Sequence, residues 1–333
     1  MAKSYNATEY MYSSARIRAF ETRIAGKEQI SRLADADSVE SVQNALGDFG
    51  FETVLTEDGR VDREETLLSV LKNGFAELEG MECADAVGFL KYQYDCNNVK
   101  SLIKCEAAGI SAESMLLPLG SVSVEDAKKA FRDKDYDVFP QNMAAAIAEA
   151  EEAFAATGNP QKVDFLIDRA AFADMLECAR RCRVPLAEKL VVTKIDLVNA
   201  MMATRLIRMR LGSQAAAIFD EVYIDGGSLD KEMLVDALTD EDKLAKALAY
   251  GNCSALAELM ASGAELGALE RAADDIWCRV AREARYVPFG AEVAIGYIFA
   301  LEYEVKNIRI ILAGKEAGLS SDIIRERLRE CYV

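Results

Sequence analysis

Two stretches of the chain repeat one pattern: Tyr94-Asp95-Cys96-Asn97-Asn98-Val99-Lys100 and Tyr303-Glu304-Val305-Lys306-Asn307-Ile308-Arg309. Matched residues keep a constant offset of 209 positions, so that Asp95 corresponds to Glu304 and Asn98 to Asn307. A fainter middle copy, Asp196-Leu197-Val198-Asn199, lies close to midway between them. Self-similarity on this scale indicates a fold built by repetition of one structural unit. Pseudo-symmetric proteins of this kind more often fit around a partner than catalyse a reaction.

The first and last copies predict helices with the same ending. Gly109 and Gly318 suit the left-handed residue that follows a helix, and Ile110 and Leu319 suit the apolar contact that accompanies it. In each copy the acid and the amide lie three residues apart beside an apolar stripe, where they can bond a neighbouring backbone. We call these residues the acid–Asn pairs and expect a structural role for them: Asp95 with Asn98, Asp196 with Asn199, and Glu304 with Asn307.

Composition predicts an all-α protein. The chain of 333 residues has five prolines and is 51% hydrophobic, which is ample for buried cores. Ala, Glu, Leu and Arg are abundant and lose little side-chain freedom in a helix, and no stretch indicates a strand. Turn signals around Pro118 and at Asp225-Gly226-Gly227-Ser228 divide the chain into three predicted helical repeats, residues 1–115, 116–225 and 226–333.

Apolar periodicity and capping residues predict the individual helices. A capping box, Asp37-Ser38-Val39-Glu40, is expected to open a short helix. Pro160 and Pro185 suit first-turn positions, and Gly26 is expected to end the first helix. The predicted ranges are 7–24, 38–46, 64–78, 84–107, 124–131, 141–156, 160–182, 185–211, 239–249, 254–261, 266–286, 290–313 and 320–331.

Charge and targeting signals favour a cytoplasmic protein with protein partners. No basic segment followed by an apolar core opens the chain, and uncharged runs reach only about a dozen residues against the roughly 20 needed to span a bilayer. The formal net charge of −17 disfavours nucleic acid and anionic lipid. Eight scattered cysteines are expected to pack as reduced thiols rather than as a disulfide framework.

Residues that commonly carry enzyme chemistry are scarce. The chain has no histidine, which removes the usual general base and the usual metal ligand, and it has no phosphate-binding glycine loop. Cys178 and Cys182 lie one helical turn apart, but two thiolates without further ligands do not make a zinc site. Asp164, Asp168 and Asp174 are expected to form one solvated helix edge. We therefore expect no cofactor, no metal and no catalytic residues.

Two basic stretches interrupt the acidic sequence, and four of their arginines recur at helical spacing: Arg205, Arg208, Arg282 and Arg285. One interpretation is a solvated face on which arginines pair with local acids. The other is a docking surface for an acidic partner or for carbonyl groups near lipid, with Trp277 and Phe289 as possible anchors.

Several segments together resemble the C subunit of the archaeal and bacterial A/V-type rotary ATPases, whose eukaryotic relative is the d subunit of the vacuolar ATPase. The resemblance runs from about residue 5 to the C-terminus. The segments that carry it are Tyr12-Ser13-Ser14-Ala15-Arg16-Ile17-Arg18-Ala19-Phe20-Glu21, the Tyr94-to-Lys100 helix, Asp168 with Phe172, and the run from Glu302 to Lys315.

This resemblance implies a funnel of three similar helical bundles around a pseudo-threefold axis. It also implies a non-catalytic central-stalk protein that couples axle subunits of the D and F type to the proteolipid c/K ring, for ATP-linked proton or sodium transport. Such a protein is cytoplasmic and peripheral to the inner face of the cell membrane. In the middle copy, Ala200 and Met201 depart from the pattern of an aliphatic and a basic residue.

Two other classes of function stay open from the sequence. A soluble α-helical adaptor would present a concave surface of stacked bundles to a partner and would have no affinity for membranes. An enzyme using carboxylates alone would need a buried pair of acids in a cleft, and no spacing in the chain points to one.

Overall fold

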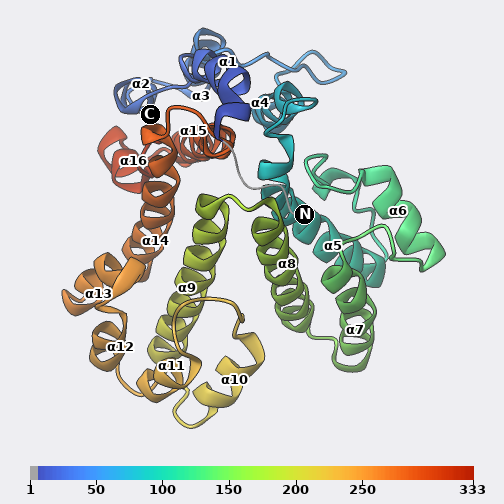
Figure 1. Ribbon diagram of the computed structural model, residues 1–333, viewed down its shortest axis with the longest axis vertical. Coiled ribbons are helices and arrows are strands. Elements are labelled where there is room, and N and C mark those ends of the chain that lie inside the picture. The colour runs from blue at the N-terminus through green and yellow to red at the C-terminus, as the bar shows by residue number, and fades with distance from the viewer. Residues whose placement is uncertain (1–6) are drawn as a thin grey trace. The chain divides into compact units, whose positions relative to one another are not determined.

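The computed structural model describes residues 7–333, and the regular structure of this range is helical (Figure 1). Within the same range, β-type pairing is limited to one isolated antiparallel bridge between Leu55 and Val61. The all-α prediction is confirmed. None of the helices over these residues is long and apolar enough to cross a membrane.

The chain forms two compact units. The first joins the N-terminal part of the chain, up to Val87, to Asp274–Val333, and the second is Gly88–Ala273. In the first unit the helical elements are η1 (Ala7–Tyr10), α1 (Met11–Glu21), α2 (Lys27–Ala34), α3 (Val39–Leu46), η2 (Gly47–Phe49), α4 (Arg63–Leu78), η3 (Ala84–Val87), the end of α14 (Leu266–Ala281), η6 (Arg282–Tyr286), α15 (Glu292–Glu316) and α16 (Ser321–Arg327).

The helix α15 is the centre of the first unit. It packs against α1, α2, α3, α4 and α16 (Figure 1). Its N-terminal two-thirds is apolar on nearly every side, and Val293, Ile295, Ile298 and Phe299 are fully buried. A helix that is apolar around most of its circumference is stable only when other elements surround it, which explains its position.

The second unit contains α5 (Gly88–Ala108), η4 (Glu113–Met115), α6 (Val124–Asp133), α7 (Gln141–Thr157), α8 (Pro160–Cys182), α9 (Pro185–Arg208), α10 (Gln214–Val222), α11 (Lys231–Ala237), α12 (Glu241–Leu248), η5 (Gly251–Cys253), α13 (Ser254–Ala261) and the start of α14 (Leu266–Ala281). The long helix α8 packs against α5, α7 and α9 (Figure 1). Val99, Phe131, Met143, Ile147 and Ile167 form part of its buried core.

Most predicted helices are present with bounds close to those expected, and α8 and α13 have the predicted bounds. Within the predicted capping box it is Ser38 that caps α3, by accepting a hydrogen bond from the Ser41 N–H. Gly109 and Gly318 both have φ of 66°, as predicted. The prediction for Gly26 was wrong. This residue is extended and caps the start of α2, because its N–H donates to the Gln29 side chain.

Three short helices, α2, α10 and α11, lie outside every predicted range, and the last predicted helix ends at Arg327 rather than at residue 331. Short helices carry few turns of periodicity, so tertiary packing rather than sequence pattern determines them. The early end of α16 also has a tertiary cause, because Asn307 binds the backbone of Arg329.

Candidate functional site

The three asparagines of the acid–Asn pairs hold three backbone segments in the same way. The Asn98 side chain donates to the Leu117 carbonyl oxygen at 2.8 Å and accepts from the Leu117 N–H at 2.7 Å. Asn199 makes the same two bonds to Ile224, at 2.8 and 3.0 Å, and Asn307 makes them to Arg329, at 3.2 and 2.8 Å. Because a primary amide carries one acceptor and one donor group, it satisfies both polar groups of a single residue.

The acids of the first two pairs each bind the segment that leads into a short helix. Asp95 accepts from the Ser121 N–H at 2.9 Å, the Ser121 hydroxyl at 2.5 Å and the Val122 N–H at 3.1 Å. Asp196 accepts from the Ser228 N–H at 2.7 Å, the Ser228 hydroxyl at 2.5 Å and the Leu229 N–H at 3.0 Å. Asp95 therefore fixes the segment before α6, and Asp196 fixes the segment before α11.

Glu304 uses a donor from a distant part of the chain. Its Oε1 accepts from the Ala25 N–H at 2.7 Å, across 279 residues, and Ala25 lies directly before α2. In all three copies the acid therefore holds a segment that enters a short helix. The longer glutamate side chain makes one such bond, whereas Asp95 and Asp196 make three each.

Burial raises the pKa of two of these acids. It raises the pKa of Asp95, and the donors from Ser121 and Val122 oppose the rise. Glu304 is 4% exposed, and burial raises its pKa to about 7 because the single Ala25 N–H only partly compensates the lost hydration. The pKa of the acid in the last copy therefore lies near neutral pH.

The four arginines singled out in the sequence have partners within the chain. In the second unit, Arg205 forms an ion pair with Glu270 at 2.7 Å, and Arg208 binds Glu241 and the Ala264 carbonyl oxygen. In the first unit, Arg282 lies 3.5 Å from Glu330. Arg285 donates to the Tyr332 carbonyl oxygen at 3.1 Å. Their pairing with nearby groups agrees with the first interpretation, and a docking role stays a prediction.

The match to known families spans nearly the whole chain. Residues 13–327 match the family described as ATP synthase (C/AC39) subunit. The chain belongs to this family. It is similar to the C subunit of the V-type sodium ATPase of Enterococcus hirae, with 23% identity over 97% of this chain and 99% of the relative. It is also similar to the C subunit of the A-type ATP synthase of Haloferax volcanii, with 27% identity over 95% and 96%.

A third relative of this C/AC39 chain is the C subunit of the A-type ATP synthase of Methanothermobacter thermautotrophicus, with 25% identity over 96% of this chain and 87% of the relative. These relatives are named as subunits of an ATP synthase or ATPase rather than as enzymes in their own right. The chain is accordingly a subunit of an A/V-type ATP synthase or ATPase complex.

The prediction of a solvated acidic edge on α8 was wrong for one of its three aspartates. Asp164 and Asp168 pair with Lys104 and Lys100. Asp174, however, is buried, and its carboxylate accepts from the Asn142 N–H, the Asn142 side chain and the Met143 N–H. The first N–H groups of a helix lack partners within that helix, so Asp174 supplies the acceptors for the start of α7.

Of the other residues considered in the sequence, three have structural positions and Phe289 is exposed. The Cys182 thiol donates to the Ala179 carbonyl oxygen, and Cys178 is buried. Trp277 packs edge-on against Phe299 at 4.6 Å between ring centroids, and Phe289 is 43% exposed. Over residues 7–333, no three or more Cys, Asp or Glu side chains are grouped so that they could hold a metal ion.

The turns that contain these two loops were predicted, but their binding to the acids was not, although the sequence carries a signal for it. Gly120-Ser121 and Gly227-Ser228 are the same dipeptide, and each supplies donors to the acid of its copy. A Cβ at Gly120 would lie 2.1 Å from Oδ1 of Asp95, and one at Gly227 would lie 2.4 Å from Oδ1 of Asp196. Glycine is therefore required for the loop to approach the carboxylate.

Gly227→Ala is expected to lower the free energy of unfolding by about 2 kcal/mol, because the added methyl must displace the loop from Asp196. The urea-denaturation midpoint measures the change. Gly47→Ala is the matched control, since Gly47 has helical φ of −58° and a methyl added there would meet no neighbouring group within 4 Å. The control should be neutral or slightly stabilising. Equal midpoints for the two variants would contradict this role of Gly227.

Proposed function

We propose that this chain is a non-catalytic central-stalk subunit of a rotary A/V-type ATPase, coupling the axle subunits to the membrane proteolipid ring. The observation that carries the proposal is the family match over residues 13–327, together with relatives named as C subunits of such machines. A protein that passes torque between two partners needs stiffness rather than reactive groups. It would act at the cytoplasmic face of the membrane, held there by the ring.

The acid–Asn pairs support this proposal because they supply stiffness at specific positions. A buried side chain that satisfies several backbone groups fixes a loop in one conformation, and loosening it leaves those groups unpaired. The proposal includes a division into three repeats at residues 1–115, 116–225 and 226–333. The residues held by Asn98 and Asn199, Leu117 and Ile224, lie close to the two proposed boundaries.

Native mass spectrometry of the chain mixed with detergent-solubilised ring and axle subunits tests the proposal. We expect a complex that holds one copy of this chain per ring. A chain that stays alone in the presence of both partners would favour the soluble-adaptor alternative instead.

The same experiment tests whether the arginines dock a partner. A single charge reversal would break an internal ion pair, so the better variant is Arg205→Glu with Glu270→Arg, which keeps the pair and exchanges the charges. If this face docks a partner, we expect the affinity for the assembled partner to fall about tenfold, or about 1.4 kcal/mol. Lys128→Glu with Glu113→Lys is the matched exchange elsewhere in the second unit, and it should have no effect. If both exchanged variants bind the partner with the same affinity, the prediction that Arg205 docks a partner is wrong.

A further inference from the structure

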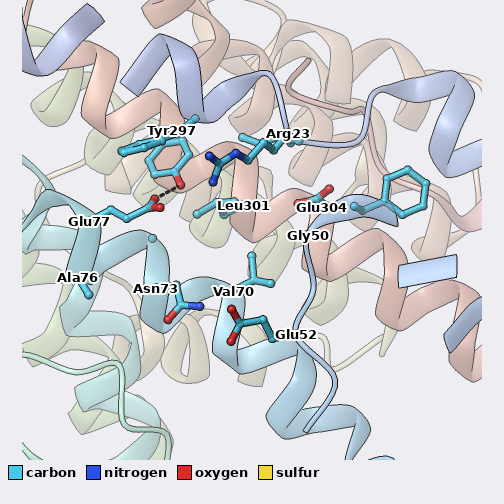
Figure 2. A pocket seen from close by; sticks show the side chains of 14 residues that line it. Arg23, Gly50, Glu52, Val70, Asn73, Ala76, Glu77, Tyr297, Leu301 and Glu304 are labelled. Atoms are coloured by element: carbon cyan, nitrogen blue, oxygen red, sulfur yellow. Dashed lines mark hydrogen bonds between the residues drawn. The ribbon is translucent and has the colours of Figure 1, made fainter. Parts of the chain in front are cut away.

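The first unit contains a pocket of about 460 Å³ at the side of α15. It is bounded by the end of α1, the segment around Gly50, the helix α4 and one face of α15 (Figure 2). Glu52 and Asn73 are exposed at this pocket, whereas Tyr297 and Glu304 are buried at 5% and 4% exposure. The pocket therefore connects solvent to buried polar groups.

Acidic side chains dominate the lining. Three carboxylates, from Glu52, Glu77 and Glu304, face the pocket, together with the guanidinium of Arg23. The Tyr297 hydroxyl donates to Oε2 of Glu77 at 2.5 Å (Figure 2). Burial and this contact raise the pKa of Tyr297, so the hydroxyl remains a donor and adds no negative charge at neutral pH. When the three acids are ionised, the charge of the lining is net negative.

Glu304 brings a polar atom without a partner to the wall of this pocket. Its Oε1 accepts from Ala25, but its other oxygen has no hydrogen-bond partner among the described residues. In Asp95 and Asp196, by contrast, both oxygens accept hydrogen bonds. Because this oxygen is accessible from the pocket, water can bind it there, and an N–H donor that entered the pocket would take the place of that water.

Aromatic rings form one side of the pocket, and an arginine of the same chain lies beside one of them. The rings of Phe20 and Tyr297 lie 5.9 Å apart, and the Arg23 guanidinium lies 5.9 Å from the centroid of the Phe20 ring. No ion pair to Arg23 or to Glu52 is found among the described residues. Cations stack favourably on aromatic rings at this separation. The rings therefore offer apolar contact to the aliphatic stem of a basic side chain, and the charged end of that side chain would meet the carboxylates of the lining.

We propose that this pocket receives a lysine or arginine side chain from an axle subunit. The inference rests on the proposed function, since that function supplies the axle as partner. Glu52 and Glu77 attract the incoming charge, the free oxygen of Glu304 accepts one of its hydrogen bonds, and the aromatic rings contact its aliphatic stem. The pocket would then fix the orientation in which the axle is held.

The test is the affinity of the full-length chain for purified axle subunits at 50 and 300 mM salt. The variant Glu52→Gln with Glu77→Gln removes two negative charges from the lining. Its new amide at position 77 can still accept a hydrogen bond from the Tyr297 hydroxyl. We expect Kd to rise at least tenfold at low salt and the dependence of Kd on salt to weaken. Circular dichroism and the urea midpoint check that the variant folds.

The control, Glu57→Gln with Glu79→Gln, changes the net charge equally at two exposed acids of the same unit that do not line the pocket. Its Kd should stay within twofold of the parent. If the parent binds the axle and the pocket variant binds within twofold of it, the pocket has no such role and the proposed function stands. If the parent itself does not bind axle subunits, the proposed function fails, and the pocket inference fails with it.

Discussion

Replacing Asn98 by leucine should lower the free energy of unfolding by about 3 to 4 kcal/mol. Asn98 is 2% exposed, and its side-chain amide donates one hydrogen bond to the backbone of Leu117 and accepts another from it. Leucine has a similar size but no polar atom, so the N–H and carbonyl of Leu117 would lose their partners. Each unsatisfied buried group costs about 1 to 3 kcal/mol.

Urea denaturation followed by circular dichroism measures the effect, and Asn97→Leu is a closely matched control. Asn97 precedes Asn98 on the same helix and is exposed. The same substitution there should change stability by less than about 0.5 kcal/mol. If Asn98→Leu were as mild as its neighbour, the bonds to Leu117 would contribute little to the fold, and the acid–Asn pairs would not be anchors.

The second large effect concerns pH and Glu304. Its pKa rises from an ordinary value of 4.5 to about 7 in the folded chain. At a pH between these two pKa values, Glu304 holds a proton in the folded protein that it has released in the unfolded chain. The stabilisation that this group contributes to the folded state is therefore fully present below about pH 4.5, and it is lost as the pH rises through 7. The size of the pKa rise corresponds to roughly 3 kcal/mol.

Glu304→Gln removes the titration and keeps an acceptor for the Ala25 N–H. We expect the variant to match the parent near pH 5 and to exceed its stability by about 2 to 3 kcal/mol at pH 8. Cys331, which also feels the charge of Glu304, has its pKa raised to about 11 by burial and does not titrate in this window. Urea midpoints of both proteins between pH 5 and pH 8 give the comparison.

Glu326→Gln is the control for this pH series, because Glu326 is exposed on α16 in the same unit. Its stability should follow the parent at every pH. A difference between parent and Glu304→Gln that stayed constant from pH 5 to pH 8 would show that Glu304 keeps the same charge in the folded and unfolded states throughout that range.

Local patterns in the sequence determined much of the fold. Apolar residues at helical spacing located the long helices, and the glycines at 109 and 318 located two of their ends. These features depend on residues within one or two turns of each other, which a linear sequence displays directly. The recurrence of an acid three residues before an asparagine also marked the positions that prove to hold neighbouring loops.

The partners of those acids were decided by the tertiary structure. Asp95 and Asp196 bind donors 26 to 33 residues further along the chain, whereas Glu304 binds Ala25 from the opposite end of the sequence. The donors are largely backbone N–H groups. Because nearly every residue carries one, no sequence pattern distinguishes the N–H that a buried carboxylate will meet.

The same distinction applies to charge. The sequence by itself determined that the chain is helical, strongly acidic and similar along its length to one family of ATPase subunits. Only the tertiary structure decided that the pKa of Glu304 rises to about 7 and that three acids line one pocket. Hydration and charge depend on what surrounds a group in space, and residues that are distant in the chain provide those surroundings.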